Sequence, residues 1–422
     1  MSSSQRQRTA ALVGAVPLIA ALFAAASASG ADWPQFRGPH RDGISEDQHI
    51  LKAWPETGPK VLWKVPLGEG YSHIAVAAGR LFTQYISGAD ELLACFDPAT
   101  GRQLWSLRTD SKFVNDQGNG PRATPTVDGD RVYALSAQGH LYAVEAGTGK
   151  KLWEHDLARE QNAKGPSWGV ASSPLVEGDL LFIQVGGAPA KTAMAFNKKT
   201  GELKWSALDD RPGYAAPIGI TVGNVRQIVF FTGSALSALS PESGKLLWHV
   251  PWETDFDANA ATPLFLAPDE VFISSGYDAG AALYRIRNGP EATAQVEQVW
   301  KSRVLKNQFS SSILRDGYIY GFDNATLKCI TAQTGEEKWK QRGLGHGSVI
   351  FADGLLILLS DAGKLVLAEA NPNGYTEKAS FQALSGKCWT GPTLANGILF
   401  LRNSESMMAI DLSMTDTKGA NP

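Results

Sequence analysis

The chain has 422 residues, of which 43% are hydrophobic and 19% are charged, and this balance excludes an intrinsically disordered protein. A formal net charge of −3 gives no sign of a basic face for nucleic acid. The 43 glycines and 12 tryptophans favour a repeated β-architecture. Length and composition together exclude a disulfide-stapled mini-domain, a coiled coil and a polytopic membrane protein.

The first 30 residues have the pattern of a secretory signal peptide. Arg6 and Arg8 precede an apolar stretch over residues 10–26, which ends in small residues up to Gly30. A retained membrane anchor is the less favoured alternative, because the stretch is short and contains a glycine and a proline. No cysteine precedes Cys95, so a lipoprotein anchor is not expected. We therefore predict export to the periplasm or the extracellular space, with no transmembrane segment in the mature chain.

Seven tryptophans recur at intervals of about 40 to 50 residues and define a repeat. They are Trp63, Trp105, Trp153, Trp205, Trp248, Trp300 and Trp339. Most of them follow a turn glycine by four residues, as Trp105 follows Gly101. Glycine there supplies the positive φ that a tight turn between strands requires. We interpret these tryptophans as anchors that pack one repeat against the next.

Each repeat contains three or four short strands that are apolar on both faces, such as residues 355–359 and 398–401. Sheets buried on both sides at this period are typical of propeller blades. Two independent sandwiches would need a polar linker near mid-chain, which is not seen. An isolated first strand at 60–67 and three C-terminal strands at 393–412 complement each other. The sequence therefore predicts an all-β, eight-bladed propeller of four-stranded antiparallel blades, closed by pairing of the N-terminal strand with the C-terminal blade; seven blades would leave one piece unpaired.

These boundaries divide the chain into four parts. They are a signal peptide at 1–30, an N-terminal extension at 31–58, the propeller at 59–413 and a flexible tail at 414–422. We expect the extension to pack across one face of the ring, and we expect a monomer.

The three cysteines are not expected to pair. Cys95 and Cys329 stand six residues before turn glycines, where other repeats have alanine, so they occupy one repeated slot for a small apolar side chain. Equivalent slots in distant repeats lie too far apart for a disulfide.

The unit from Ala143 to Trp153, with its Thr148-Gly149 turn, resembles the pyrroloquinoline quinone (PQQ) repeat. That repeat is shared by quinoprotein alcohol dehydrogenases and by BamB, an outer-membrane assembly lipoprotein. The resemblance extends from about Trp33 to Leu412. The stretches 33–38, 307–312 and 386–389 also resemble a group of PQQ-like propellers from environmental bacteria. The resemblance to the repeat implies the fold strongly and the function weakly, because the repeated tryptophans and glycines are structural.

Polar and aromatic residues just before each inner strand are expected around a central funnel. The candidates are Tyr71, Ser72, His73, Arg122, Thr124, Trp168, Ser172, Tyr214, Asp257, Asn259, Thr262, Asn307, Gln308, Ser310, His346, Lys387, Trp389 and Thr390. From these we select seven ligand-binding candidates: His73, Arg122, Trp168, Asn259, Asn307, Lys387 and Trp389. Such groups suit an anionic, planar or sugar-like ligand. The alternative is that they only line a water-filled channel.

The quinone chemistry of the resembled dehydrogenases implies calcium held by carboxylates and amides, a catalytic aspartate, and often an adjacent cysteine pair. The sequence has no adjacent cysteines and no Cys-x-x-Cys-His haem motif. Asp257 is the one carboxylate assigned to the funnel, and calcium prefers six to eight oxygen ligands. No metal site is predicted and no cofactor is assigned, although PQQ and calcium stay open.

Two functions follow. The first is a non-enzymatic, BamB-like binding or scaffold protein of the cell envelope, which receives a protein partner or a small-molecule ligand in its funnel or on its loops. The second is a PQQ- and calcium-dependent dehydrogenase of alcohols or sugars, with Asp257 as base and Arg122 or Lys387 facing the quinone carboxylates.

Overall fold

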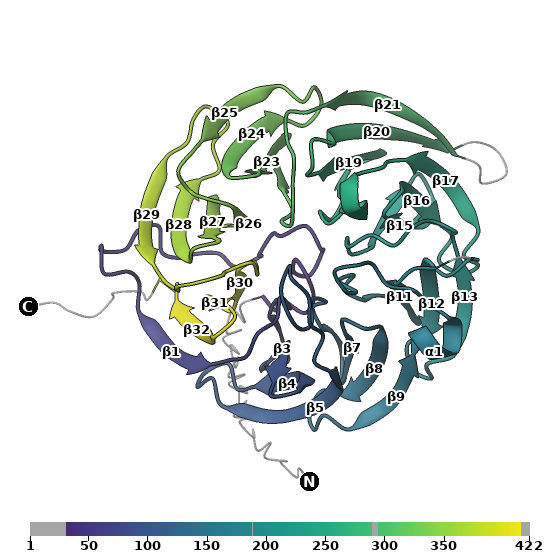
Figure 1. Cartoon of the computed structure of the whole chain (residues 1–422). Helices are drawn as coiled ribbons and strands as arrows, with labels where there is room; N and C mark the ends of the chain where they lie inside the picture. Colours follow the sequence, from purple (N-terminus) through teal and green to yellow (C-terminus); the bar gives the residue numbers. More distant parts are fainter. Residues whose placement is uncertain (1–30, 188, 289–293, 415–422) are drawn as a thin grey trace, which may run out of the picture.

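The structure is a computed structural model that describes residues 31–187, 189–288 and 294–414. The signal peptide expected at 1–30 and all but the first residue of the expected tail lie outside the described residues. Eight four-stranded antiparallel sheets stand side by side around a ring (Figure 1). The predicted eight-bladed propeller is therefore confirmed. No helix within the described ranges has the length and apolar character needed to cross a membrane.

The first four blades follow one another along the chain, each running from an inner to an outer strand. Blade 1 contains β2 (Ala75–Ala77), β3 (Arg80–Ser87), β4 (Asp90–Phe96) and β5 (Gln103–Ser111). Blade 2 contains β6 (Thr126–Asp128), β7 (Arg131–Leu135), β8 (His140–Glu145) and β9 (Lys151–Asp156), followed by helix α1 (Leu157–Gln161). Blade 3 contains β10 (Leu175–Glu177), β11 (Leu180–Gln184), β12 (Ala193–Asn197) and β13 (Leu203–Ala207). Blade 4 contains β14 (Ile218–Val222), β15 (Val225–Phe231), β16 (Ala235–Leu239) and β17 (Leu246–Pro251).

The remaining blades repeat this order until the last one. A 3₁₀ turn, η1 (Asp255–Asp257), leads into blade 5 with β18 (Leu264–Leu266), β19 (Glu270–Ser275), β20 (Gly280–Asn288) and β21 (Ala294–Ser302). Blade 6 contains β22 (Ile313–Arg315), β23 (Tyr318–Asp323), β24 (Thr326–Thr331) and β25 (Glu337–Gln341). Blade 7 contains β26 (Gly347–Ala352), β27 (Leu355–Ser360), β28 (Lys364–Glu369) and β29 (Glu377–Gln382). Blade 8 contains β30 (Thr393–Ala395), β31 (Ile398–Arg402), β32 (Ser406–Asp411) and, from the other end of the chain, β1 (Val61–Pro66).

The ring closes because β1 pairs with β32. The antiparallel register places Trp63 opposite Ala409 and Val65 opposite Met407. The pairing gives β32 a neighbour on its outer side and so removes an exposed sheet edge. The N-terminal strand therefore completes the last blade, as the sequence predicts.

The repeated tryptophans join neighbouring blades. The Trp105 ring in blade 1 lies against Gly149 of blade 2, where an added Cβ would come within 2.6 Å of the ring, and its indole N–H donates to the Ala146 carbonyl at 3.0 Å. Any side chain larger than hydrogen at Gly149 would displace the ring, so the turn glycine has a packing role as well as a positive φ of 73°. Trp153, Trp205 and Trp300 repeat the arrangement. The prediction that these tryptophans anchor blade packing is confirmed.

Cys95 and Cys329 occupy equivalent positions in different blades. Each is buried, and each faces a repeat tryptophan across the sheet, Cys95 opposite Trp105 and Cys329 opposite Trp339. The small apolar slot inferred from the repeat therefore exists.

The extension packs across the face of the ring opposite the cavity, where it contacts the turns at Ala78, Asp353 and Asn396. In addition, residues 33–45 enter the centre of the ring, which was not expected from the sequence. We call residues 33–45 the hub segment. Its backbone bonds to inner strands of three blades, at Val76, Val127 and Phe351. Figure 1 shows this purple segment inside the circle of blades. The hub segment thus fills the channel that the inner strands would otherwise leave open.

Two buried arginines explain why a polar segment enters the channel. Arg37 donates to the Ser312 carbonyl at 2.6 Å, and Arg41 donates to the carbonyls of Ser173, Pro174 and Pro217. These carbonyls precede the inner strands of three blades and converge on the axis. Burial lowers the pKa of both arginines, although each remains hydrogen-bonded on several sides. A guanidinium with five donors can satisfy several carbonyls at once, which an apolar plug could not do.

Candidate functional site

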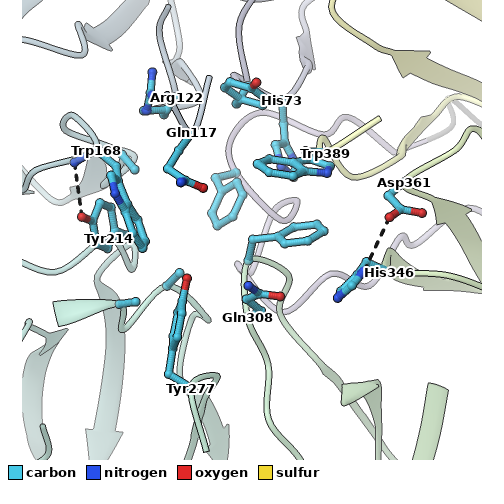
Figure 2. A pocket seen from close by; sticks show the side chains of 16 residues that line it. His73, Gln117, Arg122, Trp168, Tyr214, Tyr277, Gln308, His346, Asp361 and Trp389 are labelled. Carbon is cyan, nitrogen blue, oxygen red and sulfur yellow. Dashed lines mark hydrogen bonds and ion pairs between the residues drawn. The ribbon is translucent and has the colours of Figure 1, made fainter. Parts of the chain in front are cut away.

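A cavity of about 330 Å³ opens above the hub segment, at the centre of one face of the ring. Figure 2 shows its lining residues pointing inward from many blades. The lining consists of Phe36, Tyr71, His73, Gln117, Arg122, Trp168, Ala171, Tyr214, Ala258, Ala260, Tyr277, Gln308, Phe309, His346, Asp361 and Trp389.

Two kinds of loop build the cavity, and both lie on the same face. The first kind connects the outer strand of one blade to the inner strand of the next, and it carries Trp168 (β9 to β10) and Tyr214 (β13 to β14). The second kind connects the second and third strands of one blade, and it carries Tyr277 (β19 to β20) and Asp361 (β27 to β28). Because strands alternate in direction, both connections fall at the same end of the blades.

Aromatic rings dominate the cavity. Trp168 stacks on Tyr214 with centroids 5.4 Å apart and an interplanar angle of 26°. On another side Phe309 stacks on Trp389 at 5.2 Å and 21°. Offset stacks of this kind hold their rings rigidly. The arrangement presents flat, prepositioned surfaces to whatever enters.

Arg122 brings a cation to the wall, but its terminal nitrogens are already engaged. They donate to the carbonyls of Gly118 and Gly120. The guanidinium also lies 4.7 Å from the centre of the Phe113 ring and 5.6 Å from that of Tyr71. Burial lowers the pKa of Arg122 below its usual value. The side chain therefore holds the loop at 118–120 in place and presents only part of its donor set to the cavity.

His73 is a neutral imidazole. Burial, reinforced by the nearby positive charges of Arg37 and Arg402, lowers its pKa to about 3. Its Nε2 accepts the backbone N–H of Gly391 at 3.2 Å, which leaves the ring proton on Nδ1. The ring also meets Phe36 edge-on, with centroids 4.9 Å apart. It therefore links the closing blade to the cavity floor and does not serve as a charged group.

Asp361 is the one carboxylate among the lining residues, and its Oδ2 lies 3.5 Å from Nδ1 of His346. Figure 2 draws this pair at the edge of the cavity. Across residues 31–187, 189–288 and 294–414, no three His, Cys, Asp or Glu side chains are grouped to hold a metal ion. Calcium takes six to eight oxygens, carboxylates usually among them. The donor set of this cavity therefore does not fit the calcium–quinone group that the resembled dehydrogenases imply.

The structure brings four of the seven predicted ligand-binding residues into the cavity lining: His73, Arg122, Trp168 and Trp389. Lys387 lies at the rim instead, with Nζ 4.2 Å from the centre of the Trp389 ring.

Asn259 and Asn307 are not part of the lining. The Asn259 amide donates to the Thr232 and Trp252 carbonyls and accepts from Ser275. The Asn307 amide donates to Phe322 and accepts from Ser312. Both side chains are buried and satisfied by loop and strand ends, so each acts as an internal brace.

Asp257, the base assigned to the dehydrogenase alternative, also lies outside the lining. Its Oδ1 forms an ion pair with Nε of Arg211 at 2.7 Å. Its neighbours Ala258 and Ala260 reach the cavity, but the carboxylate is held by the arginine. The structure therefore gives Asp257 a role in fixing the loop before blade 5.

Eight residues of the lining were not predicted from the sequence: Phe36, Gln117, Ala171, Ala258, Ala260, Tyr277, Phe309 and Asp361. Tyr277 and Asp361 come from loops inside a blade, whereas the prediction from sequence covers only the segments before inner strands. The repeat already contained the signal, because both loop types lie on one face. Phe36 carried no such signal, since it belongs to the extension outside the repeat.

The fold and its tryptophan–glycine packing define an eight-bladed propeller built from PQQ-type repeats. A family model described as outer membrane protein assembly factor BamB matches residues 46–186 and 164–341. The protein therefore belongs to this family.

Relatives and solved structures include assembly factors and dehydrogenases. BamB of Yersinia pestis is 23% identical over 299 residues, which cover 67% of this chain and 72% of the relative. The quinoprotein alcohol dehydrogenase PedH of Pseudomonas putida is 28% identical over 158 residues, covering 36% of this chain but only 25% of the relative. Among solved structures, BamB of Moraxella catarrhalis has a TM-score of 0.61 at 14% identity, with 84% of this chain and 100% of that chain covered. The quinohemoprotein alcohol dehydrogenase of Comamonas testosteroni has a TM-score of 0.62 at 13% identity, with 93% and 82% covered. The structural likenesses establish the fold alone.

Proposed function

We propose that the protein is a non-enzymatic binding protein of the cell envelope, which recognises a ligand or partner at its central cavity. The observation that carries this proposal is the chemistry of the lining: stacked aromatic rings, neutral amides, and one carboxylate that faces a histidine. Such a lining supplies recognition surfaces, and none of its described residues is a serine or cysteine nucleophile beside His346 and Asp361.

Placement in the envelope rests on two observations. The segment at 1–30 has the order of charged, apolar and small residues that directs export. The family is described by an outer-membrane assembly factor, and several relatives carry that name. By analogy we assign this chain a protein partner in the envelope, held through the cavity or its surrounding loops.

A quinone-dependent dehydrogenase is the second candidate, favoured by the sequence similarity to PedH. When bound, a quinone would supply the oxidising power for an alcohol or sugar. It would meet Arg122, whose terminal nitrogens are occupied, and Asp361, whose carboxylate faces His346. This donor set weighs against the candidate, so we place it second.

A titration with PQQ and calcium separates the two candidates. Purified protein is mixed with both, and absorbance, thermal midpoint and dye reduction with alcohols and aldoses are followed. The binding-protein proposal expects no turnover with any substrate. Dye reduction that depends on PQQ, calcium and an alcohol would overturn it in favour of the dehydrogenase.

Partner capture tests the role of the cavity. Combined substitution of Arg122, Trp168 and Lys387 by alanine is expected to abolish capture of an envelope protein that the parent retains. A control variant with Arg102→Ala and Lys150→Ala, both on exposed outer turns, should capture as the parent does. Circular dichroism and melting verify that each variant is folded. Equal capture by the folded cavity variant and the parent would exclude the cavity as the binding site.

A further inference from the structure

We propose that the cavity binds a neutral saccharide, either one or two sugar rings or the end of a longer neutral chain. This inference rests on the proposed binding function and specifies its ligand. Four features of the cavity lead to it: unpartnered polar groups, aromatic faces, charge and a closed floor.

Several polar groups of the lining have no hydrogen-bond partner within the part of the chain that the structure describes. The side-chain amides of Gln117 and Gln308, the Tyr277 hydroxyl and the indole N–H groups of Trp168 and Trp389 make no hydrogen bond to any part of the chain that the structure describes. Together they offer donors and acceptors in a mixed set. A ligand rich in hydroxyl groups, each both donor and acceptor, matches such a set better than a purely apolar ligand.

The aromatic faces complement the rings of sugars. Figure 2 places Trp168 and Tyr214 on one side of the cavity and Trp389 on another, with Gln117 reaching between them. Trp168 and Trp389 are each half-buried, so part of each side chain is accessible from the cavity. The Trp389 ring is already shared with Phe309, which stacks on it, and with Lys387, whose Nζ lies 4.2 Å from the ring centre. The axial C–H groups of a pyranose form an apolar face that packs on such rings, while its equatorial hydroxyls point sideways toward the amides.

The charges favour a ligand without carboxylates or phosphates. Arg122 is engaged with two backbone carbonyls, and Asp361 faces His346. Lys387 lies at the rim, over the Trp389 ring. A ligand with several acidic groups would need several free cations inside the cavity, and the described lining offers only the partly engaged Arg122. The cavity is therefore suited to a neutral ligand.

The floor determines how much of the ligand enters. Phe36 closes the cavity from below, and Arg37 behind it is buried and bonded to blade 6. A chain cannot thread through the ring, so it can only enter by its end. A volume of about 330 Å³ is at the lower limit of small-molecule sites, which fits one or two rings.

Phe256 extends the aromatic surface beyond the cavity. Its side chain is 66% exposed, yet its ring lies 5.8 Å from Trp168 and 5.4 Å from Tyr277 between centroids. Its backbone has a positive φ of 62°, an uncommon conformation for a bulky residue. An exposed aromatic side chain on a strained turn beside the opening provides a surface for the next sugar of a chain.

Titration of the purified mature protein with cellotetraose and with maltotetraose tests the proposal. Binding is followed by tryptophan fluorescence and by ligand-observed NMR. We expect at least one of the two to bind. Trp168→Ala with Trp389→Ala should weaken binding about tenfold or more, because two aromatic walls of the cavity are lost. Gln117→Ala with Gln308→Ala should weaken it about fivefold by removing hydroxyl partners, with little effect on folding.

The control variant is Gln295→Ala, at an exposed position on the outer strand β21, which should bind as the parent does. Absence of binding by both saccharides would overturn the saccharide inference, and so would binding that the two glutamine substitutions leave unchanged. In either case, capture of an envelope partner that is lost in the Arg122/Trp168/Lys387 variant would leave the proposed function standing. If neither saccharide bound and the cavity variant captured the partner as well as the parent, both the saccharide inference and the proposed function would be overturned.

Discussion

Trp63 provides the sharpest test of ring closure, because it lies in the strand that joins the two ends of the chain. Its side chain is only 9% exposed. The ring lies against Gly101 of blade 1, where an added Cβ would come within 2.8 Å, and Nε1 donates to the Pro98 carbonyl at 2.8 Å. The ring also contacts Phe400 in blade 8, with centroids 6.0 Å apart. Trp63→Ala therefore removes contacts on both sides of the closure.

The expected loss can be estimated from the size of the buried ring. Replacing a buried tryptophan by alanine typically costs about 3–5 kcal/mol, which includes the cavity that is left. Trp153→Ala is the matched comparison, because Trp153 packs on Gly201 and donates to the Lys198 carbonyl in the same way, but between blades that follow each other in sequence. The two substitutions should lower the free energy of unfolding by similar amounts.

Urea unfolding followed by tryptophan fluorescence and circular dichroism measures both losses from the midpoint and slope. If β1 did not close the ring, Trp63 would stand on an unsupported strand and its loss would cost little. A loss below about 1 kcal/mol for Trp63→Ala, beside about 3 kcal/mol or more for Trp153→Ala, would refute the closure.

Two further predictions concern the hub segment and a titratable cluster. Arg41→Leu leaves three converging carbonyls without their donor, so it should lower the free energy of unfolding by about 3 kcal/mol or more and speed proteolysis of residues 31–58. The control Arg159→Leu, at an exposed position, should change it by less than about 0.5 kcal/mol, and equal effects of the two substitutions would contradict the role of Arg41. The hydrogen bond to Asp110 raises the pKa of His140 above the ordinary histidine value of about 6.5, while burial opposes it. The stability that His140 contributes is thus fully present below about pH 6.5 and is lost as the pH rises through its higher folded pKa. The difference in free energy of unfolding between the parent and His140→Gln, measured by urea unfolding, should therefore shrink as the pH rises. A difference that grows with pH would contradict the prediction.

Part of the candidate site could be predicted from the positions of residues within the repeat. Position just before an inner strand was enough to select His73, Arg122, Trp168 and Trp389, because the ring brings those segments to one centre. The same rule also selected Asn259, whose amide turns away to satisfy loop carbonyls. Position along a strand fixes where the backbone goes. It does not fix which partner a polar side chain finds there.

The amino-acid sequence by itself determined the blades, their number and their closure, because tryptophan, turn glycine and apolar runs recur at a fixed period and each repeat can bury its faces only against a neighbour. Only the tertiary structure decided what fills the centre. In the sequence, nothing distinguishes Arg37 and Arg41 from ordinary surface charges. In the structure, carbonyls from separate blades converge around them. Because these arginines are buried in the channel, the neighbouring Phe36 lies at the cavity floor. The contacts that place it there join residues far apart in the chain, and no periodic pattern in the sequence predicts them.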